Sequence, residues 1–314
     1  MAPDGGARAV YDPSMAHAAG IVLAGGRSSR MGSPKAALDW HGSTLLRRVT
    51  GIVARSVAGP VIVVSAPGQT LPKLDPAVEV VADEREGRGP VQGIAAGLAA
   101  IGDRAAVAYV SSTDVPLLHP AFVRRVTGAL DDDLDVALPE LGGYQQPLSA
   151  AYRVDLLPTV EDLIATDRMR PALLFERSRV LHLTEADLLQ DAALRRLDPD
   201  LVSVDNLNEP ADYERALARP APEITIEKLG RLAARSRTRR RTASAWSLGA
   251  AAAAADLTLD EHVVAALNGD HITRDPELPL VAGDTVAFMV ADAGECRPRS
   301  TSRCCARTSV APTS

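Results

Sequence analysis

The sequence predicts an α/β fold, in which helices flank a mostly parallel sheet, followed by a second, smaller domain. Three observations lead to this prediction. Short, largely β-branched apolar runs alternate with stretches whose apolar residues recur at helical spacing. The core has to be built from aliphatic side chains, because 46% of the residues are hydrophobic and only 3% are aromatic. The chain, at 314 residues, also exceeds the usual size of one domain.

The individual elements of the main domain follow from these patterns. The predicted strands are the apolar runs 20–23, 61–65, 78–81, 106–110 and 136–138. The predicted helices are the periodic stretches 45–57, 91–100, 121–130 and 156–166. Alternation of this kind favours right-handed crossovers and therefore a Rossmann-like, mostly parallel sheet. Ligands of such sheets bind beyond the carboxyl ends of the strands.

A polar stretch with two prolines, residues 218–223, predicts the end of the main domain. After it come a predicted strand at 224–227, a basic run at 228–241, an alanine-rich helix at 248–255 and a strand at 286–290. Asn268-Gly269 predicts a tight hairpin turn of type I′. We therefore expect four regions: a disordered extension over 1–18, a main domain over 19–218, a small α+β domain over 223–294 and a disordered tail over 295–314.

Composition excludes several classes of function. A net charge of −6 does not favour binding to nucleic acid or to an anionic membrane. The chain has no apolar run long enough to span a membrane and no signal-peptide pattern, so we expect a cytoplasmic protein. All three cysteines lie in the predicted tail, and the histidine and serine residues lack the spacings of zinc hydrolases and serine hydrolases.

Residues 21–35, IVLAGGRSSRMGSPK, join an apolar strand to a glycine turn and two spaced cations. Gly25 and Gly26 allow a tight turn whose N–H groups point at one anionic group, and Arg30 and Lys35 supply positive charge. The spacing matches neither a P-loop nor a dinucleotide-binding fingerprint. The stretch therefore predicts a phosphate-binding loop, with a purely structural strand-to-helix turn as the alternative.

Two acidic residues follow other predicted strands. Asp83 follows the run 78–81 and precedes a glycine-rich helix start that includes Gly93. Asp114 lies in SSTDVPLL, directly after the run 106–110, where a carboxylate can hold Mg²⁺ together with water and phosphate oxygens. The alternatives are a structural role for the glycines in the helix start, and a role for Asp114 in capping the next helix.

The full pattern LAGGRSSRMGSPK resembles the signature loop of nucleotidyltransferases and, within them, of the molybdenum cofactor guanylyltransferases (the MobA family). Four further stretches resemble this family in the same order, and together they cover most of residues 20–218. They are VVADEREGRGPVQGIAAGL, SSTDVPLL, GGYQQPLSAAYR and VDNLNEPADYERAL. The third departs from the family, because Gln146 stands where many relatives have histidine before proline.

The resemblance implies a nucleotidyltransferase-type fold and transfer of GMP from GTP to the terminal phosphate of molybdopterin or Mo-molybdopterin, with Mg²⁺ and release of pyrophosphate. It implies that Arg30, Lys35 and Asp114 are catalytic and that Asp114 binds the metal. It places the nucleotide and substrate site at Leu23, Ala24, Gly25, Gly26, Lys35, Ser65, Asp83, Gly93, Asp114, Asn206 and Asn208. Proteins of molybdenum insertion or molybdoenzyme maturation are the further partners expected.

Two other functions stay open at this point. Related cytidylyltransferases usually have alanine at the position of Gly25, so the preference for guanine depends on one residue. A cytidylyltransferase, or a nucleotidyltransferase for another phosphorylated metabolite, is therefore an alternative. A non-catalytic protein that binds or delivers molybdenum cofactor is another. For Asn208 itself, an ordinary turn at a helix start is the structural alternative.

The C-terminal stretch 263–294 resembles the C-terminal half of ubiquitin-like sulfur carriers of the MoaD and ThiS kind. The spacing of Asn268-Gly269 and Gly283-Asp284 carries this resemblance. Such carriers end in a free Gly-Gly, whereas here Gly294 is followed by Glu295 and a further stretch of chain. We therefore expect a ubiquitin-like domain without the carrier chemistry.

Overall fold

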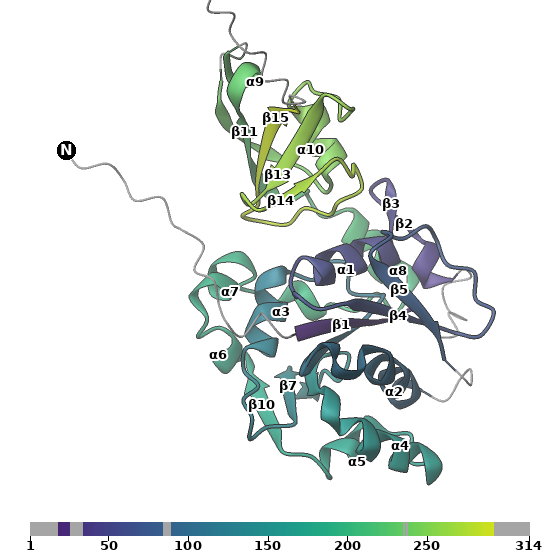
Figure 1. The fold of residues 1–314 in the computed structure, drawn as a ribbon. Helices are drawn as coiled ribbons and strands as arrows, with labels where there is room; N and C mark the ends of the chain where they lie inside the picture. Colours follow the sequence, from purple (N-terminus) through teal and green to yellow (C-terminus); the bar gives the residue numbers. More distant parts are fainter. Residues whose placement is uncertain (1–17, 26–33, 84–88, 235, 237, 292–314) are drawn as a thin grey trace, which may run out of the picture.

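A computed structural model of the chain describes residues 18–25, 34–83, 89–234, 236 and 238–291. The described part contains an eight-stranded sheet, a separate five-stranded sheet that follows it in the chain, and a short two-stranded hairpin (Figure 1). Gly26, Arg30 and nearly all of the predicted N-terminal extension and C-terminal tail lie outside the described residues. Every helix that the structure describes is too short or too polar to cross a membrane.

The large sheet has the strand order β10-β7-β9-β6-β1-β4-β5, with β8 paired to β7. Strands β6, β1, β4 and β5 are mutually parallel, whereas β9 runs antiparallel between β6 and β7. The predicted mostly parallel sheet is confirmed. The strands are β1 Ala18–Leu23, β4 Val61–Ser65, β5 Val78–Ala82, β6 Val107–Ser112, β7 Val136–Leu141, β8 Tyr144–Gln145, β9 Ser149–Arg153 and β10 Val180–Thr184. Strand β1 begins one residue before the predicted start of the domain.

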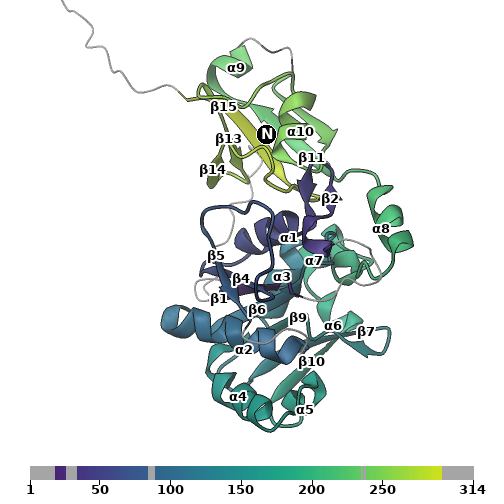
Figure 2. The ribbon, with the colours of Figure 1, turned by 90° about the vertical axis from the view of Figure 1, so that its right-hand side faces the viewer.

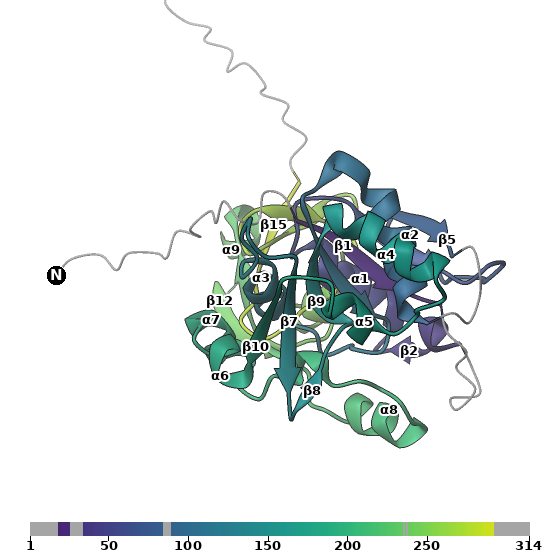
Figure 3. The ribbon, with the colours of Figure 1, turned by 90° about the horizontal axis from the view of Figure 1, so that it is seen from below.

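Helices cover both faces of this sheet. On one face α1, α3, α6 and α7 enclose a core that includes Val49 and Phe122, and on the other α2, α4 and α5 enclose a core that includes Leu98 and Leu163 (Figures 1 and 3). The four predicted helices are present as α1, α2, α3 and α4. The helices are α1 Leu45–Ala54, α2 Pro90–Ile101, α3 Pro120–Thr127, α4 Leu157–Ala165, α5 Pro171–Phe175, α6 Glu185–Leu188, α7 Ala192–Leu197 and α8 Pro210–Leu217.

Helix α2 packs closely on β1 because two of its residues have no side chain. A Cβ atom on Gly97 would lie 2.7 Å from side-chain atoms of Ile21, and one on Gly93 would lie 3.0 Å from Leu23 Cδ2. Ile21 is fully buried in a central strand and has no room to move away. The glycine pattern of this helix therefore sets the distance between α2 and the strand that leads into the glycine turn.

Replacing Gly97 with valine is expected to lower the free energy of unfolding by about 2 kcal/mol, because the added methyl groups overpack the contact with Ile21. Chemical denaturation of the full chain measures this change. Ala99→Val is the matched control, since Ala99 lies on the exposed face of the same helix and carries the same β-branched penalty. An equal loss in both variants would show that helix propensity, not packing on β1, is responsible.

The five-stranded C-terminal sheet has the order β12-β11-β15-β13-β14, with β11 and β15 parallel and the other pairs antiparallel. Helix α10 packs on it through Leu248 and Ala251, which share a core cluster with Phe288. Asn268 and Gly269 have φ angles of 53° and 90°, which confirms the predicted hairpin turn. The elements are β11 Glu223–Lys228, α9 Gly230–Ala234, β12 Arg240–Ser244, α10 Leu248–Ala254, β13 Val263–Leu267, β14 His271–Thr273 and β15 Thr285–Val290.

The C-terminal domain lies against α1 of the main domain, as Figure 2 shows. Its contact segment is residues 274–284, which we call the docking loop. Arg47 forms ion pairs with Asp275 at 2.7 Å and with Glu277 at 2.9 Å. Arg55, at the end of the same helix, pairs with Asp284 at 2.5 Å. Three ion pairs, two from Arg47 and one from Arg55, therefore fix the docking loop along one side of α1.

Candidate functional site

Four parallel strands bring most of the described predicted site residues to one edge of the large sheet. Strands β6, β1, β4 and β5 are neighbours in that order, so their carboxyl ends lie side by side. Leu23 ends β1, Ser65 ends β4 and Asp83 follows β5. The backbone N–H of Asp83 donates to the carbonyl oxygen of Ser65 at 2.8 Å. Residues distant in sequence are thus gathered where ligands of parallel sheets bind.

The start of the glycine turn is held by strand β4 and by one side chain. The Ala24 N–H donates to Val64 O at 2.8 Å, and Gln69 Nε2 donates to Ala24 O at 3.0 Å. The other end of the Gln69 amide accepts from the Ala66 N–H at 2.9 Å. A Cβ atom at Gly25 would lie 3.1 Å from the Ala66 nitrogen, so an alanine there would press on the backbone after β4.

Lys35 and Asp114 form an ion pair at the end of β6. Lys35 Nζ donates to Asp114 Oδ2 at 2.8 Å, and the two side chains are 21% and 18% exposed. The Ser112 hydroxyl donates to the other carboxylate oxygen of Asp114 at 2.5 Å. A half-buried pair of this kind interacts more strongly than a surface pair and remains accessible to a ligand. The last residue of the phosphate-loop pattern therefore reaches the predicted metal ligand.

The turn that carries Asp114 is tied to two other segments through hydrogen bonds. The Thr113 hydroxyl donates to Leu23 O at 3.0 Å, which links this turn to the glycine turn. The Leu207 N–H donates to the backbone carbonyl of Asp114 at 2.9 Å. Because Leu207 lies between Asn206 and Asn208, the predicted asparagine segment lies directly beside Asp114. The segment is remote in sequence but belongs to the same site.

The structure decides one of the alternatives and leaves a second open. Asp114 does not cap the following helix, because α3 begins at Pro120 and its N-cap is His119, whose Nδ1 accepts from the Ala121 N–H at 3.0 Å. That alternative is wrong. Asn208 does lie at a helix start, since α8 begins at Pro210 and the Asn208 N–H donates to Asp212 Oδ2 at 3.0 Å. Its position beside Asp114 is compatible with both a structural and a substrate-binding role.

Two other predicted residues have clear structural partners. Gly93 lies in α2 against Leu23, so its contact with the strand accounts for its lack of a side chain. The Ser65 hydroxyl is 6% exposed and donates to Val81 O at 3.3 Å. Sequence reasoning missed Gln69, Ser112 and Thr113, which hold the glycine turn and the carboxylate in place. The bonds of Gln69 and Thr113 to the glycine turn join segments distant in sequence, which no local pattern signals, whereas Ser112 bonds Asp114 two residues further along the chain.

The donor set fits a divalent metal held mainly by the substrate. Within the described ranges, no group of three or more His, Cys, Asp or Glu side chains is arranged to hold a metal ion. Asp114 offers one accessible carboxylate, and its neighbour Ser112 offers a further oxygen. Mg²⁺ is commonly bound by one or two carboxylates, waters and substrate phosphates rather than by an all-protein cage. Asp114 would hold such an ion, with its remaining positions left to water and phosphate.

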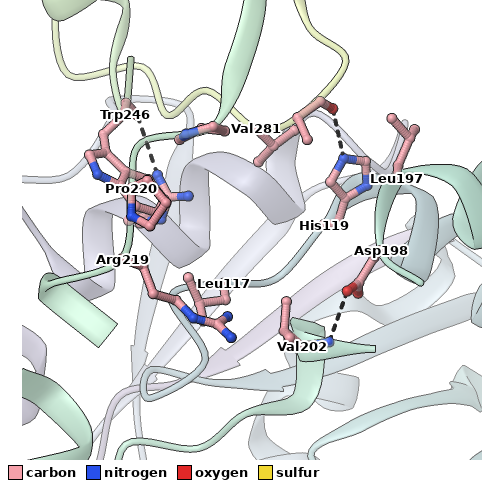
Figure 4. A pocket seen from close by; sticks show the side chains of 12 residues that line it. Leu117, His119, Leu197, Asp198, Val202, Arg219, Pro220, Trp246 and Val281 are labelled. Atoms are coloured by element: carbon pink, nitrogen blue, oxygen red, sulfur yellow. Dashed lines mark hydrogen bonds between the residues drawn. The ribbon is translucent and has the colours of Figure 1, made fainter. Parts of the chain in front are cut away.

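A cavity of about 270 Å³ lies elsewhere, between the main domain and the C-terminal domain. Its described walls include Leu117 and His119 on one side and Trp246 and Val281 on the other, as Figure 4 shows. Lys35 and Asp114 do not line it. This cavity is therefore distinct from the site at the strand ends, because its walls are mostly apolar and include neither Lys35 nor Asp114.

The predicted pterin-facing segment, residues 142–153, contains the return strand of a hairpin between β7 and β8 and then strand β9 inside the sheet. Strand β7 is antiparallel to β9, and β9 is antiparallel to β6, so β7 and β6 end on the same side. The hairpin after β7 carries Tyr144, which is 76% exposed. Gln146 lies at its return, where its N–H donates to Pro139 O at 2.9 Å. A second substrate can therefore approach Asp114 from this side of the site.

Comparison with known proteins gives matches over the main domain. The family model described as "MobA-like NTP transferase domain" matches residues 20–180. A protein of Desulfosudis oleivorans named "Molybdenum cofactor guanylyltransferase" is 33% identical over 200 residues, which are 63% of this chain and 94% of that protein. A Mycobacterium tuberculosis protein named "Probable molybdenum cofactor guanylyltransferase" is 36% identical over 179 residues, 56% of this chain and 87% of that protein.

One solved structure extends this similarity to the fold. The crystal structure of molybdopterin-guanine dinucleotide biosynthesis protein A from Archaeoglobus fulgidus has a TM-score of 0.51 and 23% identity. The match covers 63% of this chain and 96% of that chain. The matched part is less than two thirds of this chain but almost all of the Desulfosudis and Archaeoglobus proteins. This chain therefore carries a C-terminal stretch that they lack.

Proposed function

The chain belongs to the MobA-like NTP transferase family, and on that premise we propose that it transfers GMP from GTP to the terminal phosphate of molybdopterin or Mo-molybdopterin, releasing pyrophosphate. The relatives named molybdenum cofactor guanylyltransferase support this substrate pair. The observation that carries the proposal is the Lys35–Asp114 ion pair of 2.8 Å beside the end of β6. It combines a cation and a carboxylate where a triphosphate can reach both.

The chemistry requires charge compensation more than a covalent nucleophile. Both substrates are anions, and the acceptor phosphate has to approach the α-phosphorus in line with the departing pyrophosphate. Lys35, together with Arg30 and the N–H groups of the glycine turn, would bind the triphosphate and stabilise the charge that develops on pyrophosphate. Asp114 would hold Mg²⁺, which when bound neutralises phosphate charge and orients the oxygens.

The ion pair also supplies a means of keeping the site ready for its ligand. Without nucleotide, Lys35 neutralises Asp114, so neither charge is left uncompensated at the half-buried strand end. Asp114 would hold a divalent cation when one is bound, and Lys35 would then be available to bind phosphate. The Ser112 hydroxyl, which donates to the Asp114 carboxylate, would keep that carboxylate oriented.

The remaining predicted site residues take supporting roles in the proposal. Leu23, Ala24, Gly25 and Gly26 would form the turn under the nucleotide, and Ser65, Asp83 and Gly93 would border the nucleoside. Asn206 and Asn208 would contact the second substrate and the metal, since Leu207 between them is bonded to Asp114. The hairpin after β7 would face the pterin. Molybdenum insertion or molybdoenzyme maturation proteins would supply the substrate or receive the product.

We also propose the domain limits that the sequence predicts, 19–218 and 223–294. The end of α8 at Leu217 and the start of β11 at Glu223 support them. The ubiquitin-like character of the second domain is supported by its mixed five-stranded sheet and by helix α10, which packs on that sheet. The expected lack of carrier chemistry depends on Gly294 and the residues after it, which lie outside the described ranges.

Purified protein with Mg²⁺ and molybdopterin is expected to release pyrophosphate from GTP with a kcat/KM about 10²-fold higher than from CTP. Gly25→Ala should lower this preference about tenfold, because the new Cβ presses on the Ala66 backbone and shifts the turn. A coupled pyrophosphate assay with both nucleotides measures this. Preference for CTP in the wild type would identify a cytidylyltransferase, and no release from any nucleotide would favour a non-catalytic cofactor-binding protein.

A further inference from the structure

Arg48 is a buried cation at the junction of the two domains. It belongs to α1, is 3% exposed, and among the described residues its hydrogen-bond partners are three backbone carbonyls. Its Nε donates to Pro116 O, Nη1 donates to Trp246 O at 3.3 Å, and Nη2 donates to Leu280 O at 3.5 Å. One guanidinium therefore connects three segments that are far apart in the chain.

The partners of Arg48 belong to different functional parts of the molecule. Pro116 lies in the turn that carries Asp114, two residues further along the chain. Trp246 and Leu280 belong to the C-terminal domain, and Leu280 lies in the docking loop. Arg48 thus forms a direct hydrogen-bonded connection between the C-terminal domain and the turn of the proposed metal ligand.

Aromatic rings fix the guanidinium in this position. Its central carbon lies 4.8 Å from the ring centre of Trp246 and 5.6 Å from that of Trp40, within the range of cation–π attraction. Trp246 also stacks on His41 with ring centres 4.7 Å apart. Burial, and then the charge of Arg55, lower the pKa of Arg48 to about 9, against the opposing effect of Asp284. Carbonyl groups and aromatic rings from both domains offset the free energy that burial of this cation costs.

His119, at the end of the segment 114–119, forms a second connection to the C-terminal domain. His119 is 6% exposed, its Nδ1 accepts from the Ala121 N–H, and its Nε2 lies 3.1 Å from Ala282 O in the docking loop. Because Nδ1 accepts, Nε2 carries the proton and donates to Ala282 O. The stretch from Asp114 to His119 is therefore joined to the C-terminal domain at Pro116 through Arg48 and at His119 directly.

The cavity at the junction increases the contribution of these hydrogen bonds to holding the segment 114–119 in position. Leu117 and His119 line it from the Asp114 side, and Trp246 and Val281 line it from the C-terminal domain (Figure 4). A space of about 270 Å³ means that this face of the segment is not supported by dense packing. On this face its position depends on the contacts of Arg48 and His119, which add to the bonds that Thr113 and Leu207 form with the rest of the main domain.

The geometry points to Arg48 as a positioning residue through which the docked C-terminal domain holds the Asp114 turn in place for metal and nucleotide binding. This inference rests on the proposed function, because it takes Asp114 as the metal ligand. It gives the C-terminal domain a role within this chain that is independent of carrier chemistry. The Desulfosudis relative, matched over 94% of its length, lacks this stretch.

The full-length variants Arg48→Met and Trp246→Leu are expected to lower kcat about tenfold and to raise the Mg²⁺ concentration for half-maximal activity about tenfold. KM for GTP at saturating Mg²⁺ should change less than about twofold. Arg48→Lys should not restore wild-type values, since an ammonium group cannot span the three carbonyls. Trp246→Leu tests the connection from the C-terminal side if Arg48→Met does not fold.

Arg47→Met is the matched control. Arg47 is the neighbouring residue on α1, and its ion pairs are with Asp275 and Glu277 of the docking loop and not with the Asp114 turn. Its kcat and Mg²⁺ requirement should stay within about twofold of the wild type. Equal losses in the Arg47 and Arg48 variants, or unchanged values in the Arg48 and Trp246 variants, would overturn the inference.

Electron paramagnetic resonance of Mn²⁺ binding in the presence of GTP separates this inference from the proposed function. Weaker Mn²⁺ binding in Arg48→Met than in Arg47→Met supports the positioning role even if the wild type releases no pyrophosphate, an outcome that would contradict only the guanylyltransferase proposal. Equal Mn²⁺ binding in the two variants, with wild-type turnover intact, contradicts only the positioning role.

Discussion

Replacing Asp114 with asparagine is expected to lower the rate of pyrophosphate release about 10³-fold, a loss of about 4 kcal/mol of transition-state stabilisation. Asparagine keeps the shape of the side chain and can still accept from the Ser112 hydroxyl. It loses the negative charge that binds a divalent cation and places an N–H group where Lys35 Nζ donates at 2.8 Å. A pyrophosphate assay at saturating GTP and Mg²⁺ measures the loss.

The stability of the Asp114→Asn variant distinguishes chemistry from folding. The ion pair that is lost is about one fifth exposed on each side, so its removal should cost about 1 kcal/mol or less. Asp103→Asn, at an exposed position after α2, is the matched control and should retain wild-type activity. Activity within tenfold of the wild type in Asp114→Asn would exclude Asp114 as the metal ligand.

Replacing Lys35 with alanine is expected to lower kcat by about 10² to 10³, because one charge that stabilises the triphosphate and the departing pyrophosphate is removed. The melting temperature should change little, since the partner Asp114 remains accessible to water and keeps its bond from Ser112. Turnover and thermal unfolding, measured on the same preparation, test this.

Two further variants complete the Lys35 experiment. Lys35→Arg keeps the charge with a different geometry and should recover part of the lost rate. Lys73→Ala removes a charge from an exposed loop position and should have no effect. If Lys35→Ala lost melting temperature and activity in parallel, the role of Lys35 would be structural.

The central strands and the main helices were predictable from the sequence because burial is uniform there. Strands β1 and β4 are buried on both faces, so each reads as a continuous apolar run. Strand β9 was not predicted, although it lies inside the sheet between β6 and β7. Its sequence, SAAYR, contains two alanines and no β-branched residue, and its place in the sheet is decided by its neighbours and not by local preference.

The sequence predicted candidate site residues mainly where a charged residue follows the end of a strand. Asp83 stands directly after β5 and Asp114 two residues after β6, so their type and position were informative together. Gln69 and Thr113 were not predictable, because they bond the carbonyl oxygens of Ala24 and Leu23 at the end of β1, which is distant from them in sequence. Such bonds depend on the register of neighbouring strands, and the register is a property of the folded sheet.

The junction between the domains was beyond prediction from the sequence. In the sequence, the basic residues of α1 resemble the polar side of an amphipathic helix. In the structure, Arg47 forms ion pairs with carboxylates, whereas Arg48 contacts carbonyl groups and indole rings. Nothing in the sequence near Trp246 distinguishes it from a residue in the core of its own domain. Two neighbouring arginines that look alike in the sequence therefore have different partners. Only the arrangement of the C-terminal domain reveals this difference.

The contacts of Arg48 have a consequence for synthesis of the protein. Its bonds to Trp246 and Leu280 join residues separated by 198 and 232 positions in the chain. A ribosome releases the N-terminal part first, and domains generally fold in that order. The large sheet can therefore form, with Lys35 and Asp114 already at its edge, long before the last supports of the Asp114 turn have emerged. A nascent or prematurely terminated chain would carry a folded sheet whose Asp114 turn still lacks its contacts with the C-terminal domain.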